Sequence, residues 1–112
     1  MRYDIIFAPD ADSTLRKIRA YDRVAVLDAI ERHLRHEPMR TSKSRIRVLR
    51  DLRHPQYRLR IGDLRVFYDV TPGQVEVVAV VPKAEAAEWL ARWGSASKRK
   101  EGHREDGSTL GR

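Results

Sequence analysis

The chain has 112 residues, no cysteine and a net charge of +7. This length allows one small domain with a modest core, and the absence of cysteine excludes disulfides, thiolate metal sites and cysteine nucleophiles. Because the sequence has neither an apolar run of membrane-spanning length nor the features of a secretory signal, we expect a cytoplasmic protein without membrane contact.

The positive charge is concentrated in one quarter of the chain. Residues 39–65 carry nine basic and two acidic side chains, a net charge of +7, whereas the remainder carries fourteen of each. A local excess of this kind indicates a polyanionic partner, and it favours nucleic acid over a membrane surface.

The first half of the chain predicts a strand followed by two helices. Residues 3–7 read as a strand, and Pro9 suits the first turn of a helix in which apolar residues recur at helical spacing. Asp22 is the expected cap of the second helix, which Pro38 ends. The apolar stripe of this helix is expected to consist of Val24, Leu27, Ile30 and Leu34.

The second half predicts strands and a final helix. A polar loop leads to a short strand within residues 46–52, and then Gly62-Asp63 separates two alternating runs, which is the signal of a two-residue hairpin loop. A turn leads to a central strand with apolar residues on both faces, and a helical pattern covers residues 83–93. The polar residues 94–112 predict a disordered tail.

This order of elements predicts one α+β domain over residues 1–93. We expect a mostly antiparallel, twisted sheet with the two N-terminal helices packed on one face, and a short C-terminal helix.

The hairpin loop fixes which residues oppose each other. Arg60 should lie opposite Arg65, and Arg58 opposite Phe67, so that these four side chains share the face turned away from the helices. Continuing the register through the next turn places Val78 and Val80 beside Phe67 and Arg65. Lys83 then falls near the Gly62 end of the hairpin, and Trp89 reaches the rim of the same face.

Like charges directly across two strands are destabilising unless an anion lies among them. Guanidinium groups bind phosphate in a fork, and an aromatic ring stacks on a base, so this face suits RNA. Two other interpretations remain open: a solvated sheet face whose arginines oppose aggregation, and a face covered by an acidic partner protein.

The runs HPQYRLRIGDLRVFYDV (54–70) and VEVVAVV (75–81) resemble the RelE/ParE superfamily of toxins from bacterial type II toxin–antitoxin systems. The resemblance covers roughly residues 2–93 and the order of elements. It implies a RelE/ParE-like fold and a toxin that is neutralised by a cognate antitoxin and reaches operator DNA only through it.

The resemblance leaves three functions open. RelE-like members cut messenger RNA in the ribosomal A site without metal or cofactor, by attack of a ribose 2′-OH on the adjacent phosphate, and this is the leading hypothesis. ParE-like members poison DNA gyrase. The third hypothesis is a catalytically degenerate binding module within the antitoxin–operator complex.

The resemblance also assigns roles to individual positions. Arg65 matches the arginine that steadies the strained phosphate, and Arg58 and Arg60 match basic residues lining the scissile site. Lys83 stands where the nuclease members often have arginine, and Trp89 where they often have a catalytic tyrosine. The expected catalytic residues are therefore Arg65, Arg60 and Lys83. The expected RNA-binding residues are Arg58, Arg60, Arg65, Phe67, Trp89, Arg50 and Arg53.

Cleavage of this kind requires groups that accept and donate protons. Arginine cannot act as the base at any ordinary pH. Lys83 is a candidate acid, or a base if neighbouring arginines lower its pKa, and His54 and Glu85 are the other candidates. His33 and His36 lie near the end of the second helix, where a cation suits the helix dipole, and we expect no metal site there.

Overall fold

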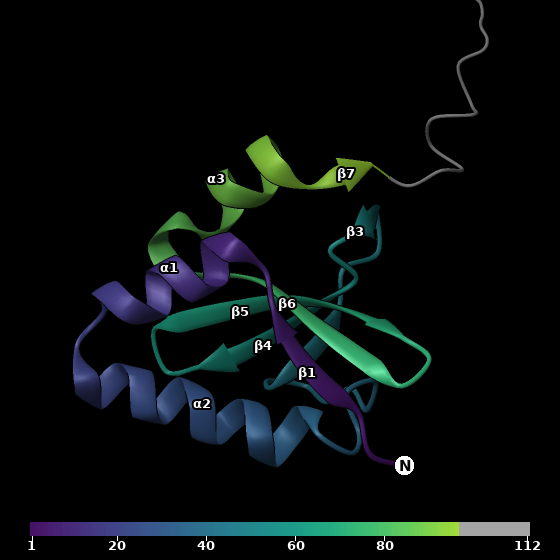
Figure 1. Ribbon diagram of the computed structural model, residues 1–112. Coiled ribbons are helices and arrows are strands. Elements are labelled where there is room, and N and C mark those ends of the chain that lie inside the picture. The colour runs from purple at the N-terminus through teal and green to yellow at the C-terminus, as the bar shows by residue number, and fades with distance from the viewer. Residues whose placement is uncertain (97–112) are drawn as a thin grey trace, which may run out of the picture.

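A five-stranded sheet in the order β1-β6-β5-β4-β2 forms the centre of the molecule in the computed structural model, which describes residues 1–96 (Figure 1). β1 runs parallel to β6, and the other neighbours in the sheet are antiparallel, which confirms the predicted α+β class. The elements are β1 (Asp4–Phe7), α1 (Pro9–Lys17), α2 (Ala20–Leu34), β2 (Ile46–Val48), β3 (Leu52–His54), β4 (Tyr57–Ile61), β5 (Leu64–Thr71), β6 (Gln74–Pro82), α3 (Lys83–Trp93) and β7 (Ser95–Ala96).

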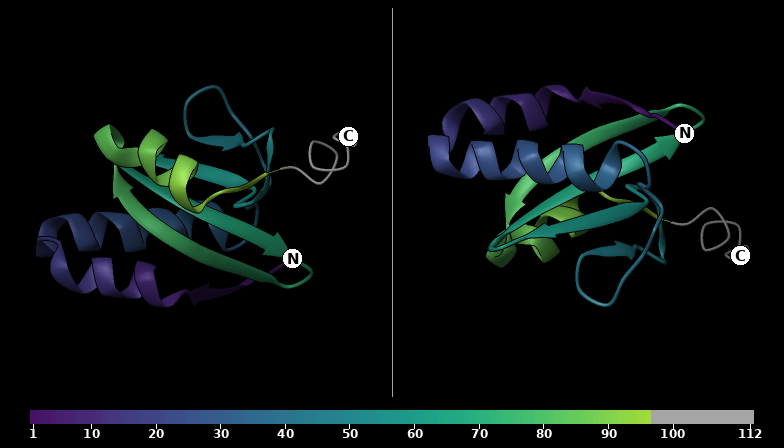
Figure 2. Two further views of the ribbon diagram at one scale, coloured as in Figure 1. Left: turned by 90° about the horizontal axis from the view of Figure 1, so that it is seen from above. Right: turned by 90° about the horizontal axis from the view of Figure 1, so that it is seen from below.

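The helices cover the two faces of the sheet unequally. α1 and α2 lie side by side on one face, and α3 lies on the opposite face (Figure 2). β3 and β7 pair in a separate two-stranded sheet beside the end of α3. None of the helices in residues 1–96 is long and apolar enough to cross a membrane.

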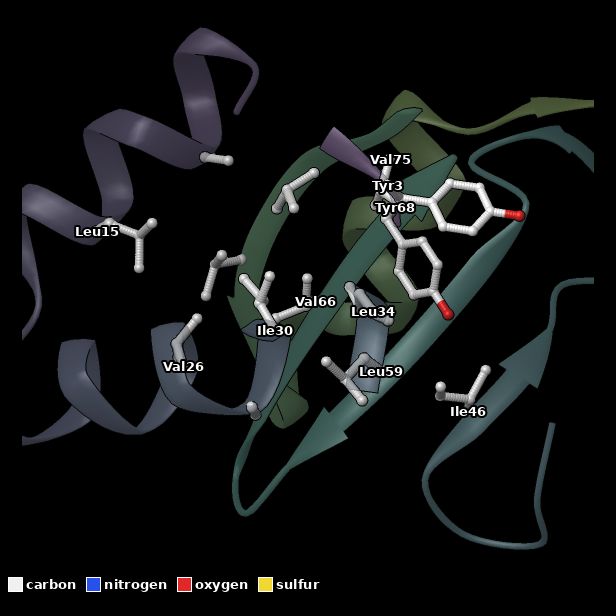
Figure 3. Close-up of a cluster of buried hydrophobic side chains, with 14 residues drawn as sticks. Tyr3, Leu15, Val26, Ile30, Leu34, Ile46, Leu59, Val66, Tyr68 and Val75 are labelled. Carbon is white, nitrogen blue, oxygen red and sulfur yellow. The ribbon is translucent and has the colours of Figure 1, made fainter. Parts of the chain in front are cut away.

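The main core lies between the sheet and the helices α1 and α2 (Figure 3). Leu59, Val66 and Tyr68 of the β4–β5 hairpin are fully buried there. Their side chains alternate with the arginines along the same strands, because successive residues of a strand point to opposite faces. The alternation of side chains along each strand therefore assigns the apolar residues to the core face and the arginines to the opposite face.

The second helix differs from its prediction in two respects. It begins at Ala20 with Arg19 as its N-cap, so Asp22 lies within the first turn and forms an ion pair with Arg19 at 3.6 Å instead of capping the helix. Val24 and Leu27 are exposed, and the residues that face the core are Val26, Ala29, Ile30 and Leu34. Both stripes satisfy helical spacing, and packing on α1 and the sheet selects the second.

The β4–β5 hairpin confirms the predicted register. Arg60 lies opposite Arg65, Arg58 lies opposite Phe67, and Gly62 has a φ of 56°, the left-handed conformation that suits glycine. The prediction for β6 holds only up to Val77. A β-bulge at Val78 then shifts the register by one residue, so that Ala79 lies beside Phe67 and Val81 beside Arg65.

Two further boundaries correct the sequence analysis. The strand expected within residues 46–52 is two strands, because a turn at Arg50 and Asp51 separates β2 from β3. Residues 95 and 96 form β7, which pairs with β3, so the predicted tail does not begin directly after α3. Most of that prediction lies outside the described residues.

The hydroxyl group of Tyr68 fastens the segment after α2 to the core. It donates a hydrogen bond of 2.5 Å to the buried Pro38 carbonyl. Burial, with a smaller contribution from Tyr57, raises the pKa of Tyr68 above its usual range, so the group stays a neutral donor. We expect Tyr68→Phe to lower the free energy of unfolding in urea by about 1–3 kcal/mol, because the buried carbonyl loses its partner.

The matched control is Tyr57→Phe, since the Tyr57 ring stacks on Tyr68 at 5.3 Å and its hydroxyl has no partner among residues 1–96. We expect this control to change stability much less. Equal effects of the two substitutions would show that the Tyr68 bond contributes nothing specific.

Candidate nucleic-acid interface

Four arginines lie on the sheet face that α1 and α2 do not cover, and we call them the strand arginines: Arg47, Arg58, Arg60 and Arg65. The sheet register places Arg47 directly opposite Arg58 and Arg60 directly opposite Arg65. Two like-charged pairs on neighbouring strands oppose folding, so their energetic cost requires a functional explanation.

The strand arginines differ from the arginines of the helices in their partners. Arg16, Arg32 and Arg35 each pair with a carboxylate four residues earlier, at 3.0, 3.1 and 2.7 Å. Within residues 1–96, no ion pair links any strand arginine to a carboxylate. Their charge is therefore available to an anion from outside the domain.

Arg65 is the most enclosed member of the group, with 7% of its surface exposed. Its Nη1 donates to the backbone carbonyls of Gly62 at 2.8 Å and Leu64 at 3.0 Å. These bonds use one edge of the guanidinium and fix its orientation. The edge formed by Nε and Nη2 has no acceptor within residues 1–96, and this is the edge that binds an oxyanion in a fork.

Arg58 is half-buried at the centre of the group. Its Nη2 donates to the Ser44 carbonyl at 3.3 Å, and its Nε is the one buried side-chain nitrogen or oxygen in residues 1–96 without a hydrogen-bond partner. Burial, followed by the charges of Arg65, Arg47 and Arg60, lowers the pKa of Arg58. The side chain is held in a charged state that the fold itself disfavours.

Two surface hollows flank the hairpin turn at Gly62-Asp63. One, of about 290 Å³, is lined by Ser44, Arg45, Arg60 and Gly62. The other, of about 450 Å³, is lined by Asp63, Pro82, Lys83 and Ala84. The hairpin end of the sheet therefore offers one hollow beside Arg45 and Arg60 and a second beside Lys83, each with room for a phosphate group.

Phe67 does not lie open to a base, which corrects its expected role, whereas Trp89 is half-buried and lines a surface hollow. Phe67 is fully buried, and its ring stacks on Trp89 with centroids 5.0 Å apart and an interplanar angle of 7°. With Ala79 and Val81 they form a second, smaller core under α3. The bulge at Val78 and the placement of α3 produce this packing, and neither is visible in the sequence pattern.

His54 lies at the far end of the arginine face from the hairpin turn. Its Nδ1 contacts Asp69 Oδ2, and Asp69 Oδ1 accepts a hydrogen bond of 2.7 Å from the Gln56 backbone. Asp69 follows Arg65 by four residues of β5, about 13 Å along the strand. His54 is thus held by a local network away from Arg65.

The remaining predicted residues divide between the two ends of the face. Lys83 begins α3, and its backbone N–H donates to the Asp63 carbonyl at 2.7 Å, which places it at the hairpin end with Arg60 and Arg65. Glu85 is exposed in the first turn of the same helix. Arg50 and Arg53 are exposed on the segment around β3, toward the end where His54 lies.

Two members of the interface were missed by the sequence analysis. Arg47 and Arg45 follow and precede the buried Ile46, in the same alternation that marks Arg58 and Arg60 around Leu59. The run SRIRV (44–48) shows this alternation. Only the pairing of β2 with β4 shows that Arg47 lies on the same sheet face as Arg58. Within residues 1–96, no three histidine or acidic side chains converge as metal ligands do.

An α+β domain that gathers the strand arginines around a hairpin turn, with no carboxylate partner for them in residues 1–96, is suited to bind a polyanion. Residues 5–87 match the family described as "ParE toxin of type II toxin-antitoxin system, parDE". The chain therefore belongs to this family, and it is a toxin of the RelE/ParE superfamily, as its hairpin motif predicted.

Two solved structures share the fold. The RelBE2 toxin–antitoxin complex from Mycobacterium tuberculosis matches with a TM-score of 0.63 and 23% identity, covering 73% of this chain and 99% of that chain. The archaeal RelE–RelB complex from Pyrococcus horikoshii OT3 matches with a TM-score of 0.53 and 20% identity, covering 74% and 97%. No curated protein matches the sequence.

Proposed function

We propose that this toxin binds the phosphate backbone of messenger RNA on the ribosome through the strand arginines and cleaves it, and so inhibits translation. The observation that carries the proposal is the like-charged pairing of Arg47 with Arg58 and of Arg60 with Arg65, without carboxylate partners in residues 1–96. A phosphodiester placed between these groups relieves their repulsion, so RNA binding compensates for a cost in folding.

In the proposed reaction, a ribose 2′-oxygen attacks the adjacent phosphorus, and the bond from phosphorus to the 5′-oxygen breaks. The products are a 2′,3′-cyclic phosphate and a 5′-hydroxyl. Arg65 and Arg60 stabilise the charge that develops on the phosphate oxygens. Lys83, a cationic side chain at the hairpin end, donates a proton to the departing 5′-oxygen, and the 2′-OH proton passes to water.

A neutralising antitoxin is the partner we propose for the same protein. Both structures that the chain resembles are complexes of a toxin with its antitoxin, although their low identity establishes only the common fold. An acidic antitoxin segment has the charge needed to occupy the strand arginines, and occupancy would exclude RNA. Operator DNA would then be contacted through the antitoxin.

Inhibition of DNA gyrase is the second candidate. It is favoured by the match to the ParE family and by the position of His54, which leaves no histidine beside Arg65 within residues 1–96. A binding module without catalysis, active in the antitoxin–operator complex, is the third.

One experiment separates these functions. The purified protein is added to a cell-free translation reaction, and the ends of the messenger RNA are mapped for 5′-hydroxyl groups, while a parallel reaction follows supercoiling by gyrase. We expect new 5′-hydroxyl ends at positioned codons. Intact message with blocked supercoiling would establish the gyrase function instead, and no effect in either reaction would leave the binding module.

A further inference from the structure

A second cationic groove lies beside the arginine face, between the C-terminal end of α2 and the segment leading to β2. It has a volume of about 270 Å³, and the lining residues that matter here are Arg32, His33, Glu37, Arg40, Ser42 and Arg45. Five of these six side chains are cationic or can donate a hydrogen bond, and Glu37 is the one acid.

The groove is held in place by the core beneath it. The Tyr68 hydroxyl fixes the Pro38 carbonyl at one end of the segment, and the buried Ile46 fixes the other. Between them, Ser42 Oγ accepts the backbone N–H of Arg45 at 3.0 Å, and the Ser42 backbone N–H donates to the Ile46 carbonyl at 3.0 Å. The Ser42 hydroxyl hydrogen remains available as a donor, and the backbone of the segment that carries Arg40 and Arg45 is held in place.

The groove is continuous with the candidate interface. Arg45 lines both this groove and the hollow beside Arg60, and the Arg45 carbonyl accepts the Arg60 backbone N–H at 2.8 Å. A strand of nucleic acid that leaves the arginine face past Arg60 therefore meets Arg45 and then the groove.

The groove carries a small excess of positive charge, because two of its three arginines are paired with carboxylates. Glu37 is paired with Arg40 at 3.1 Å, and Asp28 on α2 is paired with Arg32 at 3.1 Å. Burial, followed by the charges of Arg45 and Arg32, lowers the pKa of His33, and Asp28 opposes this effect only in part. Arg45 has no carboxylate partner within residues 1–96, and a bound anion would balance its charge.

We propose that this groove is a second phosphate-binding site, which holds a phosphodiester of RNA beyond the segment bound on the arginine face. The inference rests on the proposed RNA-binding function and extends it to a longer footprint. The shared chemistry is the phosphodiester group, which either messenger RNA or ribosomal RNA can supply.

The test compares two double variants in the full chain. Arg32→Gln with Arg40→Gln removes two exposed arginines of the groove, which pair with Asp28 and Glu37. The control, Arg16→Gln with Arg19→Gln, removes two exposed arginines that pair with Asp12 and Asp22 near the opposite end of α2 from the groove. Each double variant loses the same charge and two surface ion pairs.

Binding of a fluorescent single-stranded RNA decamer is measured by anisotropy over a range of KCl concentrations. In the groove variant we expect Kd to rise about tenfold, and the slope of log K against log salt to become shallower by about 0.7 for each phosphate that the variant no longer binds. The control should retain the wild-type slope. A trinucleotide, too short to cover both sites, should bind both variants alike.

The same variants with purified small ribosomal subunits identify the source of the phosphate. Weakened binding of the decamer indicates messenger RNA, and weakened binding of the subunit alone indicates ribosomal RNA, and either supports the site. Equal decamer and subunit binding by groove and control variants would overturn it.

An additional variant, Arg60→Gln, separates this proposal from the proposed function. If Arg60→Gln weakens RNA binding while the groove variant matches its control, the groove is not a site and the arginine face still is. If Arg60→Gln and the groove variant both leave RNA binding unchanged, both proposals fail.

His33 provides a second readout. The groups around it are Arg32 and Asp28 on α2, together with Arg45, Arg40 and Glu37 of the following segment. A phosphate beside His33 raises its pKa, so the complex binds more protons than the free protein, and decamer affinity should increase as pH falls from about 8 to 6. His33→Gln should reduce this pH dependence, and an unchanged profile would place the phosphate elsewhere.

Discussion

Arg65→Lys is expected to lower the rate of messenger RNA cleavage by about 10²–10³ while the protein remains folded. Lysine keeps the charge and can still donate to the Gly62 or Leu64 carbonyl, but it has no planar fork. The loss should appear in kcat, because the Nε and Nη2 edge acts on charge that develops during the reaction. The measurement is the initial rate at which 5′-hydroxyl ends form in the translation reaction.

Comparison with Arg65→Ala separates the structural role of this side chain from its role in cleavage. Arg65→Ala also removes the two bonds to the hairpin carbonyls, so we expect a decrease of about 1–3 kcal/mol in the free energy of unfolding in addition to the loss of cleavage. Cleavage by Arg65→Lys at the wild-type rate would remove the fork from the mechanism. Arg19→Lys, on the opposite side of the molecule, is the matched control for the substitution itself.

Arg58→Met is expected to change stability and RNA binding in opposite directions. Methionine fills a similar volume without the buried, unpartnered Nε and without the repulsion from Arg47, Arg60 and Arg65. We expect the free energy of unfolding to rise by roughly 1 kcal/mol and Tm to rise by about 4 °C. RNA affinity should fall about tenfold, because methionine cannot form a charge-assisted hydrogen bond with a phosphate oxygen.

Thermal unfolding and anisotropy on the same samples measure the two effects. Arg16→Met serves as the control, since it removes an exposed, paired arginine and should change Tm little. A destabilised Arg58→Met protein would mean that the arginine stem packs better than methionine does. Unchanged RNA affinity would place Arg58 outside the interface.

The Arg58→Met prediction and the proposed function share one physical basis. Arginines that oppose each other across neighbouring strands raise the free energy of the folded state, and an anion that binds among them lowers it again. Ligand binding to the folded state alone also stabilises it by mass action. We therefore expect RNA or an acidic antitoxin segment to raise Tm, most strongly at low salt, where the arginine charges are least screened.

Much of the hairpin was predictable from the sequence because its determinants are local. A two-residue loop with glycine at positive φ fixes the pairing, and the two-residue side-chain period then assigns Leu59 and Val66 to the core and Arg60 and Arg65 to the open face. α3 was also predicted with its observed bounds, between Pro82 and Gly94, because proline and glycine mark the two ends of a helix.

Other features depended on packing between distant segments. Trp89 and Phe67 are 22 positions apart in the sequence, and nothing in their spacing shows that one ring covers the other. The inward face of α2 was ambiguous because two apolar stripes share Ile30 and Leu34, and packing on α1 and the sheet decided between them. No turn residue or charge at Val78 predicts the bulge there.

The α+β class, the hairpin, its crowded arginines and the toxin superfamily could all be predicted from the sequence, because each follows from short-range alternation or from a contiguous motif. Which cations are brought together depends on packing between distant segments. This packing pairs Arg47 with Arg58, places Lys83 at the hairpin end, stacks Trp89 on Phe67 and holds His54 away from Arg65. These placements depend on how strands β2, β5 and β6 and helix α3 pack, and packing joins residues that no local pattern relates.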